Sequence, residues 1–157
     1  MGDDQLQITF DQVGQHNLIQ LKTLNCAIFP IKYQEKVYQD ILACGEVTQL
    51  AYYNGNLVGA IACRLENSSQ GPKLYIITLG VLAPYRGVGI GTRLVQRCLS
   101  ILESSLPEVK EAYLHVQTSN DEAIEFYKRF GFEVGDVIEN YYTRIDPPHA
   151  VILKKSL

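Results

Sequence analysis

Apolar residues recur along this chain with the periods of helices and strands, and these periods predict most of its elements. Residues 6–10 alternate weakly between apolar and polar and predict a first strand. The next residues share one face at helical spacing: Leu18, Leu21, Asn25 and Ile28. This helix is expected to end at Phe29 and Pro30, because proline disfavours helical geometry in the residue before it. A second short helix is predicted over residues 35–43.

The middle of the chain predicts a β-hairpin followed by a central strand. Residues 49–66 are mostly apolar but are interrupted by Asn54 and Gly55. Both central positions of a type I′ turn need positive φ, so an Asn-Gly pair is a strong hairpin signal. After a polar loop, residues 73–82 are apolar at nearly every position, which indicates a strand with both faces covered.

The second half of the chain predicts two further helices and three further strands. Helical spacing resumes after Gly89, with apolar residues at Ile90, Leu94, Cys98 and Ile101 or Leu102. Residues 112–117 predict a buried strand, and residues 119–132 predict a helix with an Asn or Ser cap and a glycine stop. The segments 132–144 and 149–155 are expected to complete the sheet.

Length and composition fit one globular domain that spans residues 1–157. Apolar residues make up 46% of the chain and charged residues 20%, which excludes a disordered protein. The formal net charge is -3 with scattered lysines and arginines, which excludes nucleic acid as the main partner. No apolar run reaches membrane-spanning length and the first residues do not resemble a secretory leader, so we expect a cytosolic protein without a membrane partner.

The cysteines are far apart in the sequence and form no C-x-x-C pair: Cys26, Cys44, Cys63 and Cys98. Their neighbours are mostly apolar, so we expect reduced cysteines that pack as small hydrophobic residues. The sequence therefore predicts no metal site.

A glycine-rich loop, APYRGVGIGT at residues 83–92, lies between the predicted central strand and the next helix. Glycines let a backbone approach an anion, and a helix N-terminus favours negative charge. A P-loop needs a lysine after its glycines, and a dinucleotide fingerprint opens the first βα unit, so both designs fit badly. The remaining functional interpretation is a pyrophosphate site, and the alternative is a turn that only lets strand and helix pack closely.

Two motifs in this order resemble the cofactor segments of the GNAT superfamily of N-acetyltransferases. The first is Arg86-x-x-Gly89-x-Gly91, and the second is Asn120-x-x-Ala123-x-x-Phe126-Tyr127-x-x-Phe130-Gly131-Phe132. The resemblance implies an α/β (α+β) GNAT fold, with a single mixed, mostly antiparallel sheet of about seven strands and about four helices. It also implies a V-shaped splay, with strands ending near Leu82 and Gln117, that admits acetyl-CoA.

The same resemblance implies which residues contact acetyl-CoA. The pyrophosphate would be held by the loop residues Arg86, Gly87, Val88, Gly89, Ile90, Gly91 and Thr92. Asn120 and Tyr127 would approach the pantetheine arm and the departing sulfur, and backbone amides near Leu79 and Val81 would bind the thioester oxygen. Related loops often carry a second basic residue where this chain has Gly87, so backbone amides could supply more of the phosphate contacts.

For Tyr127 the alternative is a helix residue that packs on the sheet. Its neighbours Phe126 and Phe130 are expected to be the better core residues.

Four further stretches resemble the N-terminal acetyltransferases of the NatE type: FPIKY at 29–33, LYIITLG at 74–80, YLHVQ at 113–117 and NYYTRI at 140–145. This branch acetylates the α-amine of proteins that keep their first methionine before an apolar residue, and it can also modify lysine side chains. The peptide-site residues that this implies are Phe29, Pro30, Ile31 and Tyr33 on one side and Tyr141, Tyr142 and Ile145 on the other. From the residues alone, the FP pair could only end a helix, and the YY pair could be a strand pair with one ring in the core.

The reaction needs a neutral amine and a base. A free α-amine has a pKa of about 7.7 to 8.0 and a lysine about 10.4, so the neutral α-amine is easier to present by roughly 3.4 kcal/mol. Tyr75 and His115 match the catalytic pair of the NatE-type family, which draws the proton away through an ordered water. A histidine near its ordinary pKa accepts a proton at neutral pH, so we assign proton acceptance to His115 and water positioning to Tyr75.

Two rival functions remain open at this point. One is a lysine or small-molecule amine N-acetyltransferase on the same fold, and the other is a non-catalytic acetyl-CoA-binding subunit of a larger complex. The apolar lining of the acceptor site favours a peptide, and the presence of both Tyr75 and His115 argues against the subunit. The NatE resemblance also implies nascent protein N-termini as substrate, association with the NatA scaffold and the ribosome, and a cytoplasmic location that can extend to the nucleus.

Overall fold

The computed structural model describes residues 7–157, and within this range the chain forms seven strands and four α-helices. The strands are β1 (Ile8–Gln12), β2 (Gln49–Tyr53), β3 (Asn56–Ser68), β4 (Gly71–Val81), β5 (Glu111–Gln117), β6 (Glu133–Ile138) and β7 (Ala150–Ser156). The helices are α1 (Leu18–Ile28), α2 (Glu35–Ala43), α3 (Ile90–Ser105) and α4 (Asp121–Lys128).

The strands follow the order β1-β2-β3-β4-β5-β7-β6 in a mixed sheet. Antiparallel pairs join β1 to β2, β2 to β3, β5 to β7 and β6 to β7, whereas β4 and β5 run parallel. The parallel ladder pairs Leu74 with Ala112 and Tyr75 with Tyr113, and it stops before either strand ends. The predicted mixed, mostly antiparallel sheet is confirmed.

The chain divides into two compact units. Unit 1 contains the described residues up to Leu65 together with Ile76–Pro107, and unit 2 contains Glu66–Tyr75 together with Glu108–Leu157. Unit 1 therefore holds β1, β2, α1, α2 and α3, and unit 2 holds α4, β5, β6 and β7. Strands β3 and β4 contribute residues to both units.

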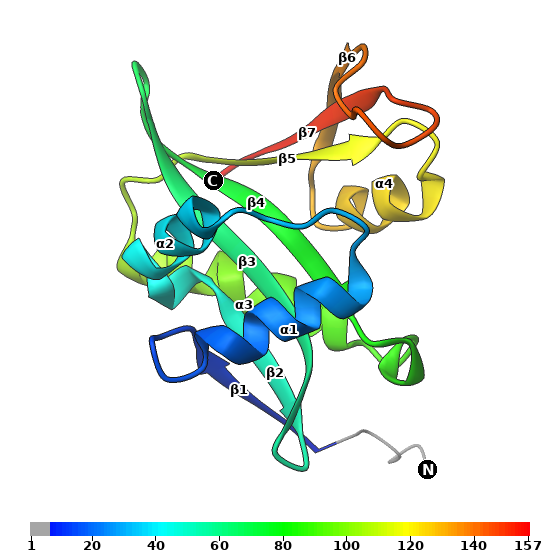
Figure 1. The fold of residues 1–157 in the computed structure, drawn as a ribbon. Helices are drawn as coiled ribbons and strands as arrows, with labels where there is room; N and C mark the ends of the chain where they lie inside the picture. Colours follow the sequence, from blue (N-terminus) through cyan, green and yellow to red (C-terminus); the bar gives the residue numbers. More distant parts are fainter. Residues whose placement is uncertain (1–6) are drawn as a thin grey trace. The chain divides into compact units, whose positions relative to one another are not determined.

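The core of unit 1 follows from the alternation of side chains along β3. Ala62 belongs to the same buried apolar cluster as Leu21 of α1. The next residue, Cys63, places its Sγ 3.7 Å from the Sγ of Cys98 on α3. Successive strand residues point to opposite faces, so a strand buried on both faces needs the near-continuous apolar run that this segment has. Figure 1 shows α1 and α3 on opposite faces of these strands.

The predicted boundaries in unit 1 are mostly confirmed. Helix α1 ends one residue before Phe29, whose extended backbone leads into Pro30, and α2 covers the predicted residues. Asn54 and Gly55 have φ of 50° and 79° and form the turn between β2 and β3. The first strand was predicted to begin at Leu6, which lies outside the described residues, and it extends two residues further than expected.

The cysteines agree only in part with the expectation of buried, reduced side chains. All of them are free thiols, and Cys63 and Cys98 are buried. Cys44 is half-buried and Cys26 is exposed on α1, so these two are not core residues. On α3 the buried stripe continues to Leu102 rather than to Ile101.

In unit 2, strand β5 alternates strictly between a buried face and a half-exposed face. The buried residues are Ala112, Leu114 and Val116. The half-exposed residues are Glu111, Tyr113, His115 and Gln117. The prediction of a buried strand is therefore correct for one face only, and the other face carries polar and titratable side chains.

Helix α4 begins at the predicted cap, because Asn120 Oδ1 accepts a hydrogen bond from a backbone N–H of the first turn at 3.1 Å. The expectation that Phe126 and Phe130 would be the better core residues is wrong. Tyr127 is the buried residue of this helix, and its ring centroid lies 5.4 Å from that of Phe132, which follows the helix. The buried face of α4 is thus set by contact with the residues leading into β6.

Candidate active site

The glycine-rich loop enters α3 with a backbone that glycine adopts readily. Gly87 and Gly89 have φ of 81° and 87°, and Gly89 is the N-cap of α3. A Cβ built at either glycine meets no protein atom within 4 Å, so positive φ rather than crowding explains both residues. The first helical residues are Ile90, Gly91 and Thr92. Their N–H groups have no carbonyl one turn earlier in the helix and form its positive end, which suits an anion.

Arg86 and Val88 occupy exposed positions in this loop. Arg86 Nε donates a hydrogen bond to the Val81 carbonyl oxygen at 2.7 Å, which holds the guanidinium beside the end of β4. The two Nη groups take no part in that bond. Val88 is 51% exposed, so its side chain is not needed for packing between strand and helix.

The end of β4 lies directly beside the FPIKY segment. A Cβ built at Gly80 would lie 2.8 Å from Cζ of Phe29, so the lack of a side chain at Gly80 lets the Phe29 ring lie against the strand. Leu79 and Val81, on either side of this glycine, are half-buried. Within unit 1 the structure thus brings Phe29 next to the strand residues that were predicted to bind the thioester oxygen.

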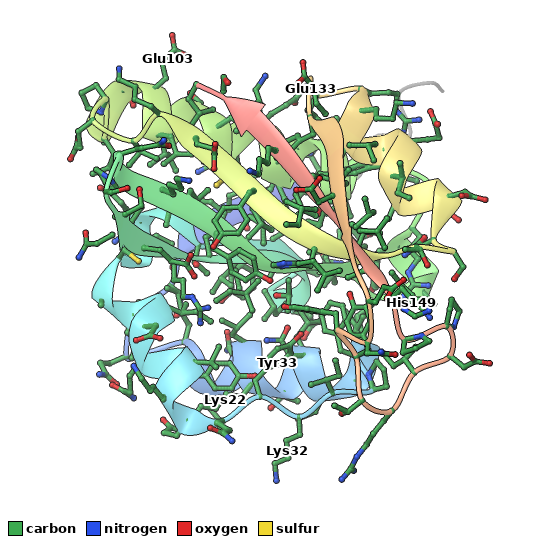
Figure 2. The ribbon with its side chains drawn as sticks, turned by 90° about the horizontal axis from the view of Figure 1, so that it is seen from above. Lys22, Lys32, Tyr33, Glu103, Glu133 and His149 are labelled. Carbon is green, nitrogen blue, oxygen red and sulfur yellow. The ribbon has the colours of Figure 1, made fainter. Side chains whose placement is uncertain are left out.

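The remaining residues of this segment differ in exposure. Pro30 and Ile31 are exposed, with Ile31 at 42%. Tyr33 is partly buried and packs against the apolar cluster formed by α1, α2, β2 and β3. In Figure 2 Tyr33 lies beside α1, whereas the neighbouring Lys32 points away from it. The segment therefore presents apolar surface at Ile31 while Phe29 and Tyr33 anchor it.

Tyr75 and His115 are brought together in unit 2. The Tyr75 hydroxyl lies 2.9 Å from His115 Nδ1, and the two rings meet edge to face at 5.6 Å. The register of β4 and β5 sets Tyr75 opposite Tyr113, and His115 follows two residues later on the same face of β5. The pairing of β4 with β5 therefore brings the side chains of Tyr75 and His115 into contact.

Burial controls the charge of the imidazole. Desolvation lowers the pKa of His115 below its ordinary value, and the negative charge of Glu66 acts in the opposite direction. The neutral imidazole is therefore favoured at neutral pH, and this is the form that can accept a proton.

The loop between β6 and β7 covers the imidazole. The ring of Tyr141 stacks on that of His115, with centroids 4.3 Å apart and planes inclined by 13°. The hydroxyls of Tyr141 and Tyr75 are 3.5 Å apart. Tyr141, Tyr75 and His115 thus form one contiguous aromatic cluster in unit 2.

Backbone hydrogen bonds hold this loop. Tyr142 N–H donates to the Pro148 carbonyl oxygen at 2.8 Å, and Asn140 N–H donates to His149 Nδ1 at 3.1 Å. Figure 2 places His149 at the point where the loop leads into β7. Tyr142 and Ile145 are half-buried, and burial raises the pKa of the Tyr142 phenol. The strand predicted over 132–144 ends earlier, at the end of β6, so the interpretation of the YY pair as strand residues is wrong.

Asn120 and Tyr127 lie at opposite ends of α4 in unit 2. Asn120 Oδ1 caps the helix, and Nδ2 is the hydrogen-bond donor that this side chain can offer to a ligand. Tyr127 is 5% exposed and packs between the rings of Phe126 and Phe132. Tyr127 therefore packs as a core residue of α4, and little of its surface reaches solvent.

Sequence reasoning missed two residues of the His115 cluster. The Tyr113 hydroxyl donates a hydrogen bond to Glu66 Oε1, and the Tyr113 ring lies 4.9 Å from that of Tyr75. The period of two along β5 already places Tyr113 on the face of His115, so this signal was present in the sequence. Nothing local indicates that Glu66 reaches Tyr113, because that contact depends on the pairing of distant segments.

Among residues 7–157 no group of three or more His, Cys, Asp or Glu side chains is arranged to hold a metal ion. None of the helices in this part of the chain has both the length and the apolar character needed to cross a membrane.

Comparison with known proteins gave matches over most of the chain. The model described as "Acetyltransferase (GNAT) family" matches residues 18–132. The chain is 48% identical over 151 residues to N-alpha-acetyltransferase 50 of Danio rerio, which covers 96% of this chain and 89% of that protein. It is 47% identical over 150 residues to the probable N-acetyltransferase san of Drosophila melanogaster, covering 96% and 81%. A solved structure, Arabidopsis thaliana Naa50 in complex with the bisubstrate analogue CoA-Ac-MVNAL, matches with a TM-score of 0.89 at 50% identity, over 97% of this chain and all of that one.

Proposed function

This chain belongs to the acetyltransferase (GNAT) family and is closely related to N-alpha-acetyltransferase 50, and from this premise we propose its substrate and the roles of its site residues. It is an acetyl-CoA-dependent N-alpha-acetyltransferase. We propose that it acts on N-termini in which a retained methionine precedes an apolar residue. The observation that supports this substrate is the analogue bound by the Arabidopsis relative, whose peptide part, MVNAL, begins with Met and Val.

Acetyl-CoA supplies the activated acetyl group, and the glycine loop fits a pyrophosphate. The open space beside Gly87 and Gly89 and the free N–H groups of the first turn of α3 support contacts from the backbone of residues 87–92. Arg86 is held in place by its bond to Val81 and would contribute the charge of its Nη groups. Asn120 Nδ2 and the Tyr127 hydroxyl are proposed to contact the pantetheine arm.

We assign peptide contacts to two segments. In unit 1, Phe29, Pro30, Ile31 and Tyr33 would contact the first methionine, which the anchored Phe29 and the exposed Ile31 support. In unit 2, Tyr141, Tyr142 and Ile145 would contact the peptide, which their position on an ordered loop beside His115 supports. Burial of the methionine side chain would favour binding by about 0.8 kcal/mol per methylene.

His115 is proposed to accept the proton that the amine loses as its nitrogen bonds to the acetyl carbon. We place the hydrogen of the neutral ring on Nδ1, where it donates to the Tyr75 oxygen, so that Nε2 accepts the proton through an ordered water. Backbone N–H groups near Leu79 and Val81 would stabilise the oxyanion. The C–S bond then breaks, and the departing thiolate takes a proton while His115 releases the one that it accepted, which returns the imidazole to its neutral form.

The family resemblance also supports a wider context. By that resemblance we propose association with a NatA-type scaffold at the ribosome, nascent chains as substrates, and a cytoplasmic location that extends to the nucleus. The family match at residues 18–132 includes parts of both units, which supports one acetyltransferase domain over residues 1–157.

A peptide panel tests the proposed substrate. Peptides that begin Met-Leu or Met-Val are expected to be acetylated far faster than otherwise identical peptides that begin with Ser or Ala. A Met-Leu peptide with a blocked N-terminus and one internal lysine is the control for side-chain acetylation. Equal rates across all first residues, or faster reaction of the blocked peptide, would contradict the assignment.

A further inference from the structure

Glu66 and Tyr113 are connected by contacts to the catalytic pair, Tyr75 and His115. The proposed mechanism gives Glu66 and Tyr113 no role. Glu66 Oε1 accepts a hydrogen bond from the Tyr113 hydroxyl, and the Tyr113 ring lies 4.9 Å from the ring of Tyr75. Tyr75 in turn contacts His115 Nδ1. All four residues lie in unit 2, so the series of contacts runs without interruption from Glu66 to the imidazole.

The pairing of β4 with β5 places Tyr113 where its ring can restrict movement of Tyr75. Tyr113 pairs directly with Tyr75 across the β4–β5 ladder and shares a face of β5 with His115. A ring that is anchored at its hydroxyl restricts the ring packed against it, because protein interiors are closely packed. Movement of Tyr75 away from Nδ1 is thus opposed from the side of Tyr113.

Glu66 also contributes charge. Within residues 7–157, the titratable side chains in contact with His115 are Tyr75 on β4, Tyr113 on β5 and Tyr141 in the loop after β6. The negative charge that acts on this imidazole comes from Glu66. Across β7 the residue paired with His115 is Ile152, which is apolar. The carboxylate therefore offsets part of the burial that weakens His115 as a base.

We propose that Glu66 is a positioning residue for this acetyltransferase, acting through the Tyr113 hydroxyl to hold Tyr75 on His115 and through its charge to keep the imidazole basic. The inference rests on the proposed function for its catalytic consequence. Its structural content, the series of contacts from Glu66 through Tyr113 and Tyr75 to His115, is independent of that function.

Two variants separate the hydrogen bond from the charge. Glu66→Gln keeps an oxygen that accepts from Tyr113 and removes the charge. It is expected to lower the pKa of His115, since an opposite charge stabilises the imidazolium. The part of the fall in kcat that depends on His115, below the titration of the substrate amine, should therefore move to lower pH. Tyr113→Phe keeps the ring and the charge but removes the anchor. It is expected to lower kcat about five-fold, with KM for peptide and acetyl-CoA nearly unchanged.

The readouts are pH profiles of kcat and the NMR titration of the His115 ring, identified among the ring signals by its loss in His115→Ala. Glu111→Gln is the matched control, because Glu111 is a carboxylate on the same face of β5 and pairs with Lys73 at 3.2 Å. This control is expected to leave the His115 titration unchanged. Circular dichroism establishes that each variant is folded, and Tyr113→Phe tests the anchor even if Glu66→Gln fails to fold.

The outcomes distinguish this inference from the proposed function. A His115 midpoint in Glu66→Gln equal to that in Glu111→Gln overturns the role of the charge, and an unchanged kcat in Tyr113→Phe overturns the role of the anchor. A wild-type protein that is inactive on Met-Leu peptides overturns the proposed function instead. The NMR titration still reads the coupling of Glu66 to His115 in that case.

Discussion

At the residue scale, His115 sits between a hydrogen bond and a stacked ring. Tyr75 contacts its Nδ1 and Tyr141 covers one face of the imidazole, so much of its hydration is replaced by protein. Burial places its pKa below the usual value of about 6.5, and the ring is neutral at pH 7. A free α-amine, with a pKa of about 7.7 to 8.0, is still mostly protonated there. The substrate amine rather than His115 therefore limits the supply of reactive species near neutral pH.

The catalytic pair predicts a specific pattern of losses. His115→Ala is expected to lower kcat by about 100-fold or more, the usual scale for a general base, and Tyr75→Phe by about 10-fold through loss of one hydrogen bond. Acetyl-CoA affinity should stay near that of the wild type. Tyr52→Phe is the matched control, because it removes an exposed hydroxyl that bonds to Gln20 at 2.8 Å. Reduced thermal stability with normal turnover per folded enzyme would instead show that the pair only packs.

At the element scale, the sequence predicted what local chemistry controls. The bounds of α2, the end of α1 before Pro30 and the hairpin at Asn54 follow from periodicity, proline geometry and positive φ, all of which act within a few residues. The buried face of α4 could not be predicted this way. Tyr127 is buried there because of its contact with Phe132, which lies beyond the end of the helix. The half-exposed face of β5 was missed for a related reason, since burial depends on what covers the strand.

Substitution of Gly89, the N-cap of α3, is expected to weaken acetyl-CoA binding in addition to lowering the stability of the fold. Gly89→Ala places a Cβ at φ of 87°, which costs about 1 to 2 kcal/mol, and it disturbs the N–H groups proposed to hold the pyrophosphate. Gly55→Ala is the matched control, since Gly55 has φ of 79° and open space around it but lies in the β2–β3 turn. Both variants should lose similar stability in denaturant titrations. Calorimetry should show weaker acetyl-CoA binding for Gly89→Ala alone, and equal affinities would assign the loop to packing only.

At the scale of the whole molecule, the proposed site residues are distributed over both units. The glycine loop and the FPIKY segment belong to unit 1. Unit 2 contains Tyr75, His115, Asn120 and the loop that carries Tyr141 and Tyr142. The sequence indicated these segments through resemblance to a family, because spacing alone cannot show which distant segments share a function. Where no family motif marked a residue, as for Glu66, sequence reasoning found nothing. The bond from Tyr113 joins positions 47 residues apart and is visible only in the folded chain.

Acetyl-CoA binding is therefore expected to slow amide hydrogen exchange in segments of both units. Acetyl-CoA that binds only the folded state stabilises it, by about 2.7 kcal/mol at about 100 times Kd. Since contacts are proposed from residues 87–92 in unit 1 and from Asn120 in unit 2, amide hydrogen exchange should slow in both segments when acetyl-CoA is added. The turn at Asn54 and Gly55 is the internal control, because no proposed contact lies there, and its exchange should stay fast. Protection confined to the glycine loop would remove Asn120 and Tyr127 from the cofactor site, while protection in both segments would support a single acetyltransferase domain.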